Sequence, residues 1–268
     1  MNKDKIKEIV VCKIDEITVL CEQISPDFDK DVIHDFRVTF KYLRSFLRLI
    51  RAHNKEKGLK LSDRLKDLYQ TAGIIRDAQL ELEKINIEGM ELADYTLLLN
   101  NKIELQKKKW NKFYSKRVLH QFKKRAEGYN FEELPAGVLS NFLNSRMASI
   151  DLTMQIESPS DVQIHSVRKN AKDMIYTSDL AKKNSWKGVK NELKPFPLKK
   201  LNDVADKIGD YNDERQLISN ISSFSTHTKE QEEREEIEKI RKTKEPKILS
   251  HKKNIITLVK ELFDKGNH

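Results

Sequence analysis

The sequence predicts an all-α protein, on three observations. Apolar residues recur at spacings of three and four along almost the whole chain, which is the period of an amphipathic helix. Only 8 Gly and 6 Pro occur in 268 residues, and they are scattered, whereas a sandwich or barrel needs a turn signal about every ten residues. Hydrophobic residues make up 38% and charged residues 35%, which suits helices with one apolar face.

The first part of the chain contains four predicted helices. Ser25-Pro26 ends the first of them, and Asp29 or Asp31 supplies the N-cap of the second. Gly73 lies inside the third helix, where it can produce a kink. The predicted ranges are 3–23, 29 or 31 to 53, 59–85 and 92–127, with turns at 54–58 and 86–89.

The same plan repeats in the second part. Ser158-Pro159 breaks the chain between two helices, and Ser160 or Asp161 starts the second of these. Pro246 lies within the last helix, which tolerates it or bends there. The predicted ranges are 136–157, 160–183, 198–222 and 229–265, with a loop at 184–197.

Several residues of the two parts match at a constant offset, which predicts an internal duplication with insertions confined to loops. The offset is 131 for the histidine-bearing helices and 136 for the helices that follow them. The matched pairs are His34/His165, Arg37/Arg168, Lys41/Lys172, Gly73/Gly209 and Asp77/Asp213. We therefore predict two homologous four-helix halves, 1–130 and 131–268, related by pseudo-twofold symmetry within a single domain.

The net charge of +9 makes an anionic partner plausible, whether nucleic acid, a membrane surface or a soluble polyanion. The first residues are charged throughout and lack the apolar region of a signal peptide. No run of about 18 apolar residues occurs, so we expect no membrane span. Cys12 and Cys21 fall roughly 13 Å apart on the first predicted helix, too far to bridge, and are predicted to be reduced core residues of a cytoplasmic protein.

The second predicted helix carries a column of basic residues, spaced 3, 4, 3, 4 and 3 apart. At this spacing the column occupies one arc of about 100° on the helix. Its members are His34, Arg37, Lys41, Arg44, Arg48 and Arg51. The apolar seam occupies the adjacent arc and consists of Ile33, Phe36, Phe40, Leu43, Leu47 and Ile50. The column is therefore predicted to lie beside the core face, at the edge of a groove or in a cleft.

Two interpretations of this column remain open. One is a solvated or ion-paired face, although Asp35 is the only acid between His34 and Arg51. The other is a track for a repeating anion. From His34 to Arg48 the helix rises about 21 Å, enough to face several successive phosphates. Arginine suits phosphate oxygens because its guanidinium can donate two parallel hydrogen bonds.

A shorter column lies on the sixth predicted helix. Its members are His165, Arg168 and Lys172, with Lys169 at the border. Ile175 and Asp179 replace Arg44 and Arg48 at the matching positions, so we expect the first half to dominate binding. Each histidine opens a column near a helix N-terminus. There it is either a satisfied structural residue or a phosphate contact that becomes cationic when the anion arrives.

Further basic residues widen the positive surface. The third predicted helix adds Arg64, Lys66 and Arg76, and the seventh adds Lys199, Lys200 and Lys207. Of these, Arg64, Lys199 and Lys200 are candidate contacts. Asp77 and Asp213 are interpreted as partners that orient basic residues or cap backbone groups. The fourth predicted helix has ten Lys/Arg between Lys102 and Arg125 against one acid, Glu104, and part of this face is expected to be solvated.

No catalytic residue, metal ligand or cofactor site is predicted. The sequence lacks a phosphate-cradling glycine loop, a GxSxG elbow, an HExxH motif and a CxxC pair. It also lacks the opposed acidic metal ligands that enzymes acting on phosphate polymers normally use. Aromatic residues make up only 7% and do not interleave with the basic column as single-strand binders require. These absences favour a binding protein over an enzyme.

The basic columns resemble the signature of the CHAD domain family, the conserved histidine α-helical domain. HDFRVTFKYLRSFLR and HSVRKNAKDMIY are similar to its HxxRxxxK/RxxR motif, and GIIRD and GDYND are similar to the helix that follows. The resemblance covers essentially the whole chain, 1–268. It implies two four-helix bundles with a basic central cleft or pore lined by the histidine-bearing helices.

The resemblance also implies the ligand, because family members bind inorganic polyphosphate and some associate with polyphosphate granules. The contacts it carries over are His34, Arg37, Lys41, Arg44, His165, Arg168 and Lys172. Helical geometry and charge add Arg48, Arg51, Arg64, Lys169, Lys199 and Lys200 to the candidate set. Many members are fused to a triphosphate-tunnel enzyme domain, which does not fit in this chain, so we expect a stand-alone binder.

The resulting expectation is non-catalytic binding of inorganic polyphosphate without a cofactor or metal. A nucleic-acid-binding helical protein is the first alternative. It is disfavoured because the column lies beside the apolar seam and no recognition-helix pattern occurs. An enzyme that acts on phosphate polymers and a purely structural helical scaffold are the remaining alternatives.

Overall fold

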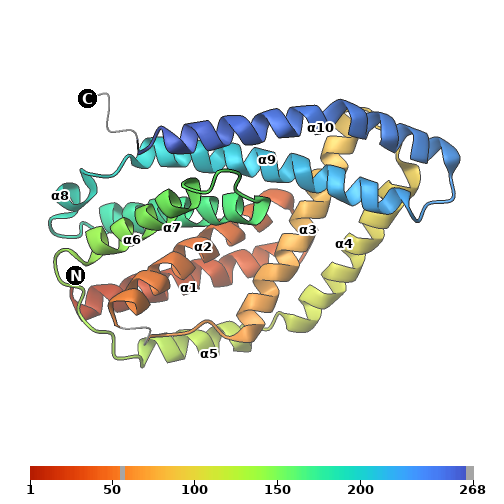
Figure 1. Cartoon of the computed structure of the whole chain (residues 1–268). Coiled ribbons are helices and arrows are strands. Elements are labelled where there is room, and N and C mark those ends of the chain that lie inside the picture. The colour runs from red at the N-terminus through yellow and green to blue at the C-terminus, as the bar shows by residue number, and fades with distance from the viewer. Residues whose placement is uncertain (55–57, 264–268) are drawn as a thin grey trace. The chain divides into compact units, whose positions relative to one another are not determined.

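The computed structural model describes residues 1–54 and 58–263 and confirms the all-α prediction, since α-helix is the only regular secondary structure in these residues. Long helices joined by short connections follow one another along the chain (Figure 1). They are α1 (Lys3–Ile24), α2 (Lys30–His53), α3 (Asp63–Ile87), α4 (Ala93–Phe113), α5 (Lys116–Glu127), α6 (Val138–Met154), α7 (Asp161–Lys183), α8 (Val189–Leu193), α9 (Leu198–Ser225) and α10 (Gln231–Lys260).

The helix predicted over 92–127 is wrong as a single element, because the chain breaks into α4 and α5 at Ser115. The backbone of Ser115 is extended, with φ −156° and ψ 130°. Its hydroxyl accepts a hydrogen bond from the Arg117 amide at 3.2 Å, so this serine is the N-cap of α5. Apolar spacing continues through the break and therefore conceals it. The loop predicted over 184–197 likewise contains one short helix, α8.

Two other helix starts follow their predicted capping signals. The Asp29 carboxylate caps α2, accepting hydrogen bonds from the amides of Asp31 and Val32, both at 2.9 Å. Ser160 and Gln163 form a capping box at the start of α7, in which the side chain of each accepts a hydrogen bond from the amide of the other. These caps fix where the two histidine-bearing helices begin.

Glycine and proline inside the helices do not end them. Gly73 lies within α3 and Pro246 within α10, and both helices continue past these residues. The predicted turn at 54–58 lies mostly outside the described residues. The last helix ends at Lys260, short of its predicted end at 265, and residues 264–265 lie outside the described residues.

The chain forms two compact units. Unit 1 comprises 1–83, 98–142 and 176–193, and unit 2 comprises 84–97, 143–175 and 194–268. Each unit draws on separated stretches of chain, so neither is one continuous half. The predicted division at residue 130, the duplication and the central cleft stay predictions.

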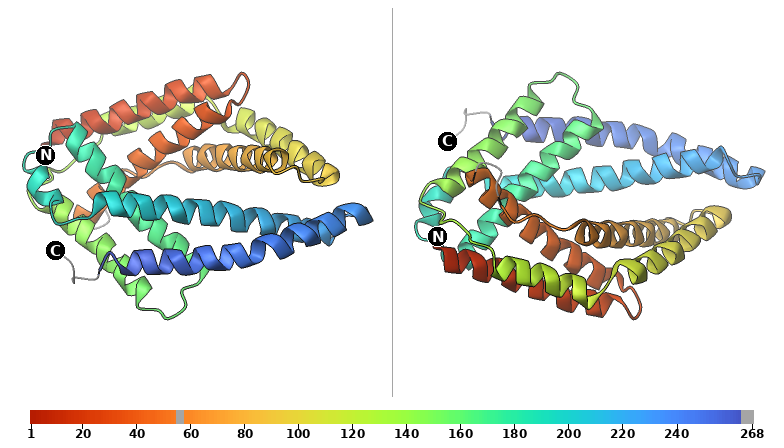
Figure 2. Two further views of the ribbon diagram at one scale, coloured as in Figure 1. Left: turned by 90° about the horizontal axis from the view of Figure 1, so that it is seen from above. Right: turned by 90° about the horizontal axis from the view of Figure 1, so that it is seen from below.

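In unit 1, α1 packs against both α2 and α5 (Figure 2). An aromatic cluster joins α4 to this core around Trp110, which is fully buried. The Trp110 ring meets Phe36 at 5.6 Å and Phe28 at 6.2 Å, both edge to face, and stacks on Tyr114 at 6.0 Å. Because Phe36 belongs to the apolar seam of α2, this cluster anchors the helix that carries the basic column.

In unit 2, α9 packs along α10 (Figure 1). Glu233 of α10 reaches the first turn of α4, where its carboxylate accepts a hydrogen bond from the Tyr95 amide at 3.0 Å. At the start of α7, the Asp161 carboxylate accepts hydrogen bonds from the Tyr211 hydroxyl at 2.6 Å and from Lys252 at 2.9 Å. Burial and the bond to Asp161 raise the pKa of Tyr211. Asp161 thus links α7 to α9 and α10.

Both cysteines are free, but only Cys21 is buried. Burial raises the pKa of its thiol. The prediction of a core position is wrong for Cys12, which is exposed. The buried face of α1 runs through Val10, Ile14 and Ile17, and two residues of helix place Cys12 roughly 200° around the axis from Val10.

Candidate anion-binding site

The basic column of α2 lies beside a buried apolar face, as its spacing predicts. The buried seam consists of Ile33, Phe36, Phe40, Leu43, Leu47 and Ile50. In the column itself His34 is exposed, whereas the other members are half-buried: Arg37, Lys41, Arg44, Arg48 and Arg51. Half-burial reduces screening by water, so these charges interact with each other and with any ligand more strongly than on an open face.

A cavity of about 580 Å³ lies between α2 and α3 within unit 1. Its lining residues are Arg37, Phe40, Arg44, Leu61, Lys66, Tyr69, Gln70, Gly73, Ile74 and Asp77. The lining therefore combines three cations with one carboxylate, that of Asp77. We refer to this cavity as the α2–α3 pocket.

Tyr69 of α3 organises the two arginines of the pocket. The guanidinium carbon of Arg37 lies 5.0 Å from the centre of the Tyr69 ring, and that of Arg44 lies 5.2 Å from it. Both contacts are within cation–π range. Phe40 stacks on the same ring, with centroids 4.7 Å apart and an interplanar angle of 23°. The ring thus holds two like charges near each other without neutralising either.

Gly73 leaves the space on the surface of α3 that the Arg37 guanidinium occupies. A Cβ atom built on Gly73 would lie 1.8 Å from Nη1 of Arg37 and 3.0 Å from its guanidinium carbon. Gly73 is buried and lies one turn after Tyr69 on the same helix. The absence of a side chain at this position is therefore what lets the guanidinium lie over the helix backbone.

The pocket is rich in donors and poor in acceptors. Within the described part of the chain, neither Arg37 nor Arg44 makes an ion pair with a carboxylate. Nε of Arg44 is buried and lacks a hydrogen-bond partner there. The same holds for Nη1 of Arg76, which lies beside His34 and outside the pocket lining. Buried donors normally find a partner, and an unmade bond costs free energy. An anion with several oxygens would supply the missing acceptors.

His34 is held as a neutral acceptor at one end of the column. Nη2 of Arg76 lies 3.0 Å from Nδ1 of His34, and an arginine can only donate, so Nδ1 accepts and carries no proton. Desolvation of the ring, and then the positive charge of Arg76, lower the pKa of His34. Without an anion, the first position of the column therefore carries no charge.

The shorter column of α7 lies in unit 2, and its basic side chains make hydrogen bonds and an ion pair with residues of α9. Nε of Arg168 donates to the carbonyl of Ala205 at 3.0 Å. Lys172 forms an ion pair with Asp206 at 2.8 Å and donates to the Asn202 side chain at 3.0 Å. Desolvation, and then the nearby cations of α7, lower the pKa of His165. The basic groups of this column thus already have acceptors from α9.

The two columns make matching contacts at positions related by the offsets of 131 and 136. In both, the arginine lies over a glycine of the next long helix, which is α3 after α2 and α9 after α7. The histidine meets the residue three positions after that glycine. The contacts are Arg37–Gly73 and Arg168–Gly209, and His34–Arg76 and His165–Asn212. Matching of this kind is expected of a duplication.

The same offsets also reveal how the two sites differ. The matched positions are Phe40/Ala171, Lys66/Asn202, Tyr69/Ala205 and Gln70/Asp206. Arg168 therefore has no ring to stack on at the position of Tyr69. A carboxylate stands beside Lys172, where the first site has the neutral side chain of Gln70. The first site is the more positive and the more aromatic of the two.

The remaining candidates lie outside the α2–α3 pocket. On α2 these are His34, Lys41, Arg48 and Arg51, so the pocket takes only Arg37 and Arg44 from the column. Elsewhere they are the second column and the exposed residues Arg64, Lys169, Lys199 and Lys200. Asp179, which interrupts the second column, accepts a hydrogen bond from the Tyr42 hydroxyl at 3.2 Å. Burial, followed by Asp179, raises the pKa of Tyr42 to about 12. Tyr69 is the site residue that sequence reasoning missed, although its position one turn before Gly73 places it on the same face of α3.

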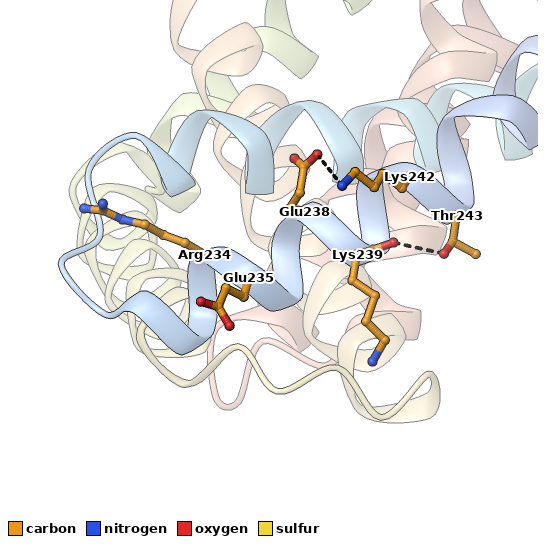
Figure 3. A pocket seen from close by; sticks show the side chains of 6 residues that line it. All are labelled: Arg234, Glu235, Glu238, Lys239, Lys242 and Thr243. Atoms are coloured by element: carbon orange, nitrogen blue, oxygen red, sulfur yellow. Dashed lines mark hydrogen bonds and ion pairs between the residues drawn. The ribbon is translucent and has the colours of Figure 1, made fainter.

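Other hollows of the described residues have a different chemistry. One lies along α10 and mixes signs, with the Lys242–Glu238 ion pair at 3.5 Å and a hydrogen bond from the Thr243 hydroxyl to the Lys239 carbonyl (Figure 3). The described part of the chain contains no group of three His, Cys, Asp or Glu that could hold a metal ion. No helix within it is long and apolar enough to cross a membrane.

The fold and the site define a class of protein: an all-helical domain with two histidine-led basic columns, in each of which an arginine lies over a glycine of the next long helix. The chain belongs to the CHAD domain family, whose model matches residues 14–219. That range includes both basic columns and the α2–α3 pocket. The family assignment thus agrees with the resemblance carried by the motifs.

A solved structure supports the fold independently. The chain is similar to the crystal structure of the CHAD domain from the plant Ricinus communis, with a TM-score of 0.66 at 14% sequence identity. The match covers 94% of this chain and 91% of that chain. At this identity the likeness concerns the fold alone. No curated protein matches the sequence.

Proposed function

We propose that this CHAD domain binds inorganic polyphosphate without cleaving it, chiefly through the α2–α3 pocket. The observation that carries the proposal is the pair formed by Arg37 and Arg44, both held on the Tyr69 ring at 5.0 and 5.2 Å. Neither has a carboxylate partner among the described residues. Two ordered guanidiniums without an internal acceptor are preorganised for an anion, because little side-chain entropy remains to be lost on binding.

The spacing of the column suits a chain of phosphates. From Arg37 to Arg44 the helix rises about 10 Å, and the column continues to Arg48 and Arg51. A polyphosphate chain has no groove width and no bases to accommodate, so a curved run of cations is sufficient. Bound polyphosphate would also account for association with polyphosphate granules where these form.

The aromatic ring of the pocket argues against single-stranded nucleic acid. Single-strand binders stack bases on free aromatic faces. Here the ring of Tyr69 is already covered by two guanidiniums and by Phe40. The pocket thus offers charge to a backbone but no stacking platform to a base.

The scarcity of carboxylates in the pocket favours binding of polyphosphate over its hydrolysis. Enzymes that hydrolyse phosphoanhydrides through two metal ions need several opposed acids. Among the lining residues only Asp77 has a carboxylate. We therefore expect polyphosphate incubated with the protein and magnesium to keep its length, as measured by release of inorganic phosphate.

The decisive experiment is titration with long-chain polyphosphate and with pyrophosphate in about 150 mM salt, where the Debye length is about 8 Å. Wild type is expected to bind the long chain far more tightly. Arg37→Gln combined with Arg44→Gln should weaken binding by at least tenfold, since hydrogen bonds to charged groups contribute about 1.5–3 kcal/mol each. Lys108→Gln combined with Lys109→Gln removes the same charge from α4 and serves as the matched control.

Two outcomes would contradict the proposal. Equal losses in the pocket variant and the α4 control would mean diffuse electrostatic attraction rather than a site. Equal affinity for pyrophosphate and the long chain would exclude a polymer as the specific ligand. Competition with RNA or duplex DNA of matched charge completes the test, because a nucleic-acid binder would release polyphosphate first.

A further inference from the structure

Helix α4 exposes leucines on a side that lies roughly 120° around the helix axis from its core face. Its buried side between Leu98 and Phe113 runs through Leu99, Ile103, Gln106 and Trp110. Leu98 and Leu105 lie away from this seam and are 48% and 53% exposed. The two lie seven residues apart, two helical turns, and so share one side of α4. Exposed leucines aligned in this way cost solvation free energy unless a partner covers them.

Four lysines share that side of the helix. They are Lys102, Lys108, Lys109 and Lys112, and all are exposed. At 100° per residue they fall with the leucines in an arc of about 120°. Lys102 and Lys109 flank the leucines on one side, and Lys108 and Lys112 on the other. No ion pair engages these four lysines within the described chain, and no acid lies in the arc between Leu98 and Lys112.

We propose that this side of α4, the Leu98–Lys112 face, docks on the surface of an anionic lipid bilayer. Charge complementarity selects an anionic partner, and the leucines select an anionic partner that has an apolar interior. A soluble polyphosphate or a nucleic-acid backbone would use the lysines and leave both leucines in water. A bilayer accepts the leucines at the boundary of headgroups and acyl chains, and its anionic headgroups pair with the lysines.

The order of side chains across the arc suits a helix lying flat on a surface. The leucines occupy the centre and the lysines both margins. Lysine has a long apolar stem, so each can reach headgroup level while the leucines enter below it. The face is on α4 and shares no residue with the α2–α3 pocket. Docking therefore goes beyond polyphosphate binding and does not depend on it.

The experiment is co-sedimentation of the full chain with vesicles in about 150 mM salt, where exposed charges are screened beyond about 8 Å. One set of vesicles is phosphatidylcholine alone, and the other contains phosphatidylglycerol as well. Wild type is expected to sediment with the anionic set only. Leu98→Ser combined with Leu105→Ser should weaken this binding on the order of tenfold, because two apolar side chains no longer enter the bilayer.

Controls separate the face from general effects on surface charge and folding. Leu249→Ser alters a leucine of α10 that is 61% exposed, and it should bind vesicles as wild type does. Circular dichroism should confirm that every variant is folded, as expected for exposed positions. Arg37→Gln combined with Arg44→Gln should keep vesicle binding while losing polyphosphate, so the two proposals can fail separately.

Three outcomes would overturn the inference. The first is no binding of wild type to anionic vesicles. The second is a leucine variant that binds them as tightly as wild type, which would make the face a lysine surface for soluble polyanions or nucleic acid. The third is self-association of wild type without lipid that the leucine variant abolishes, which would assign the leucines to a second copy of the chain.

Discussion

Tyr69 positions the two half-buried arginines of the candidate site. A flexible arginine loses conformational entropy when it binds an anion. Stacking Arg37 and Arg44 on a ring that Phe40 already holds removes much of that cost before the ligand arrives. The ring faces also attract both cations and offset part of their mutual repulsion.

Replacing Tyr69 by leucine should therefore weaken polyphosphate binding by roughly tenfold, since each cation–π contact at a partly exposed site contributes about 0.5–1 kcal/mol. Tyr69→Phe keeps the ring and should bind as wild type does. Isothermal titration of both variants measures the difference. Equal affinities for the leucine and phenylalanine variants would show that the ring has no positioning role.

Gly73→Ala tests the path of Arg37 across α3. The new Cβ would lie 1.8 Å from Nη1, at the movable end of a side chain, so Arg37 has to leave its place over the helix. Alanine is the better helix former by about 1 kcal/mol, so thermal stability should not fall. Polyphosphate affinity is nevertheless expected to drop. At the matched Gly209 the distance to Arg168 is 3.0 Å, and the same change should have a smaller effect.

The two histidines predict that, as pH falls, the free energy of unfolding decreases and the affinity for polyphosphate increases. Desolvation lowers the pKa of both His34 and His165 in the folded protein. The unfolded chain, with a pKa near 6.5, then binds more protons than the folded one at slightly acidic pH. The contribution of the two histidines to the free energy of unfolding is present above about pH 6.5. It is lost as pH falls through their lower pKa in the folded protein. A bound polyanion favours the imidazolium, so affinity should rise over the same range.

Melting temperatures and polyphosphate affinities between about pH 7 and pH 5.5 test this, because carboxylates with a pKa near 4 contribute little there. Ligand-free wild type should melt at lower temperature as pH falls. His34→Gln combined with His165→Gln should flatten both dependences. A variant that keeps the full slopes would assign the titration to other groups.

At the scale of the helix, α2 both packs into the core and carries the basic column. Its apolar seam is buried, and the aromatic cluster around Trp110 anchors it. The basic column occupies the neighbouring arc, so the same packing that buries Phe40 fixes the direction of Arg37 and Arg44. A cap at Asp29 sets the start of the helix. The column is rigid because the seam is rigid.

The break between α4 and α5 provides a prediction at this scale. Ser115→Ala removes the side chain that accepts from the Arg117 amide, and should lower the free energy of unfolding by about 1 kcal/mol. Ser115→Asp retains an acceptor and should be close to wild type. Denaturant titration distinguishes the two variants. If both unfold alike, the cap does not stabilise α5.

At the scale of the whole chain, the two columns differ in the contacts that their basic groups already make. The column of unit 1 offers Arg37 and Arg44 without an ion pair among described carboxylates. In unit 2, Lys172 is already paired with Asp206, and Arg168 donates to a backbone carbonyl. Binding an anion there means breaking existing contacts first.

Arg168→Gln should accordingly reduce polyphosphate affinity less than Arg37→Gln does. Asp206→Asn should raise affinity by a few-fold, since it releases Lys172 from an ion pair worth up to about 1 kcal/mol. Competition binding against labelled polyphosphate measures all three variants. An Arg168→Gln loss as large as that of Arg37→Gln would mean that both units bind equally.

The sequence by itself determined the fold class, the positions of most helices and the arc on which each basic column lies. These depend on local periodicity and on capping residues, which are written along a single stretch of chain. It did not reveal the break between α4 and α5 at Ser115, because the apolar spacing continues through this N-cap. It also did not reveal that Cys12 is exposed.

Only the tertiary structure decided which cations are available to a ligand. That depends on contacts between residues far apart in the sequence: Tyr69 and Gly73 of α3 against Arg37, and Asp206 of α9 against Lys172. The sequence periodicity of α2 or α7 shows only on which side of its helix a basic residue lies. The neighbouring helix determines whether that residue is clamped and open to an anion or already neutralised.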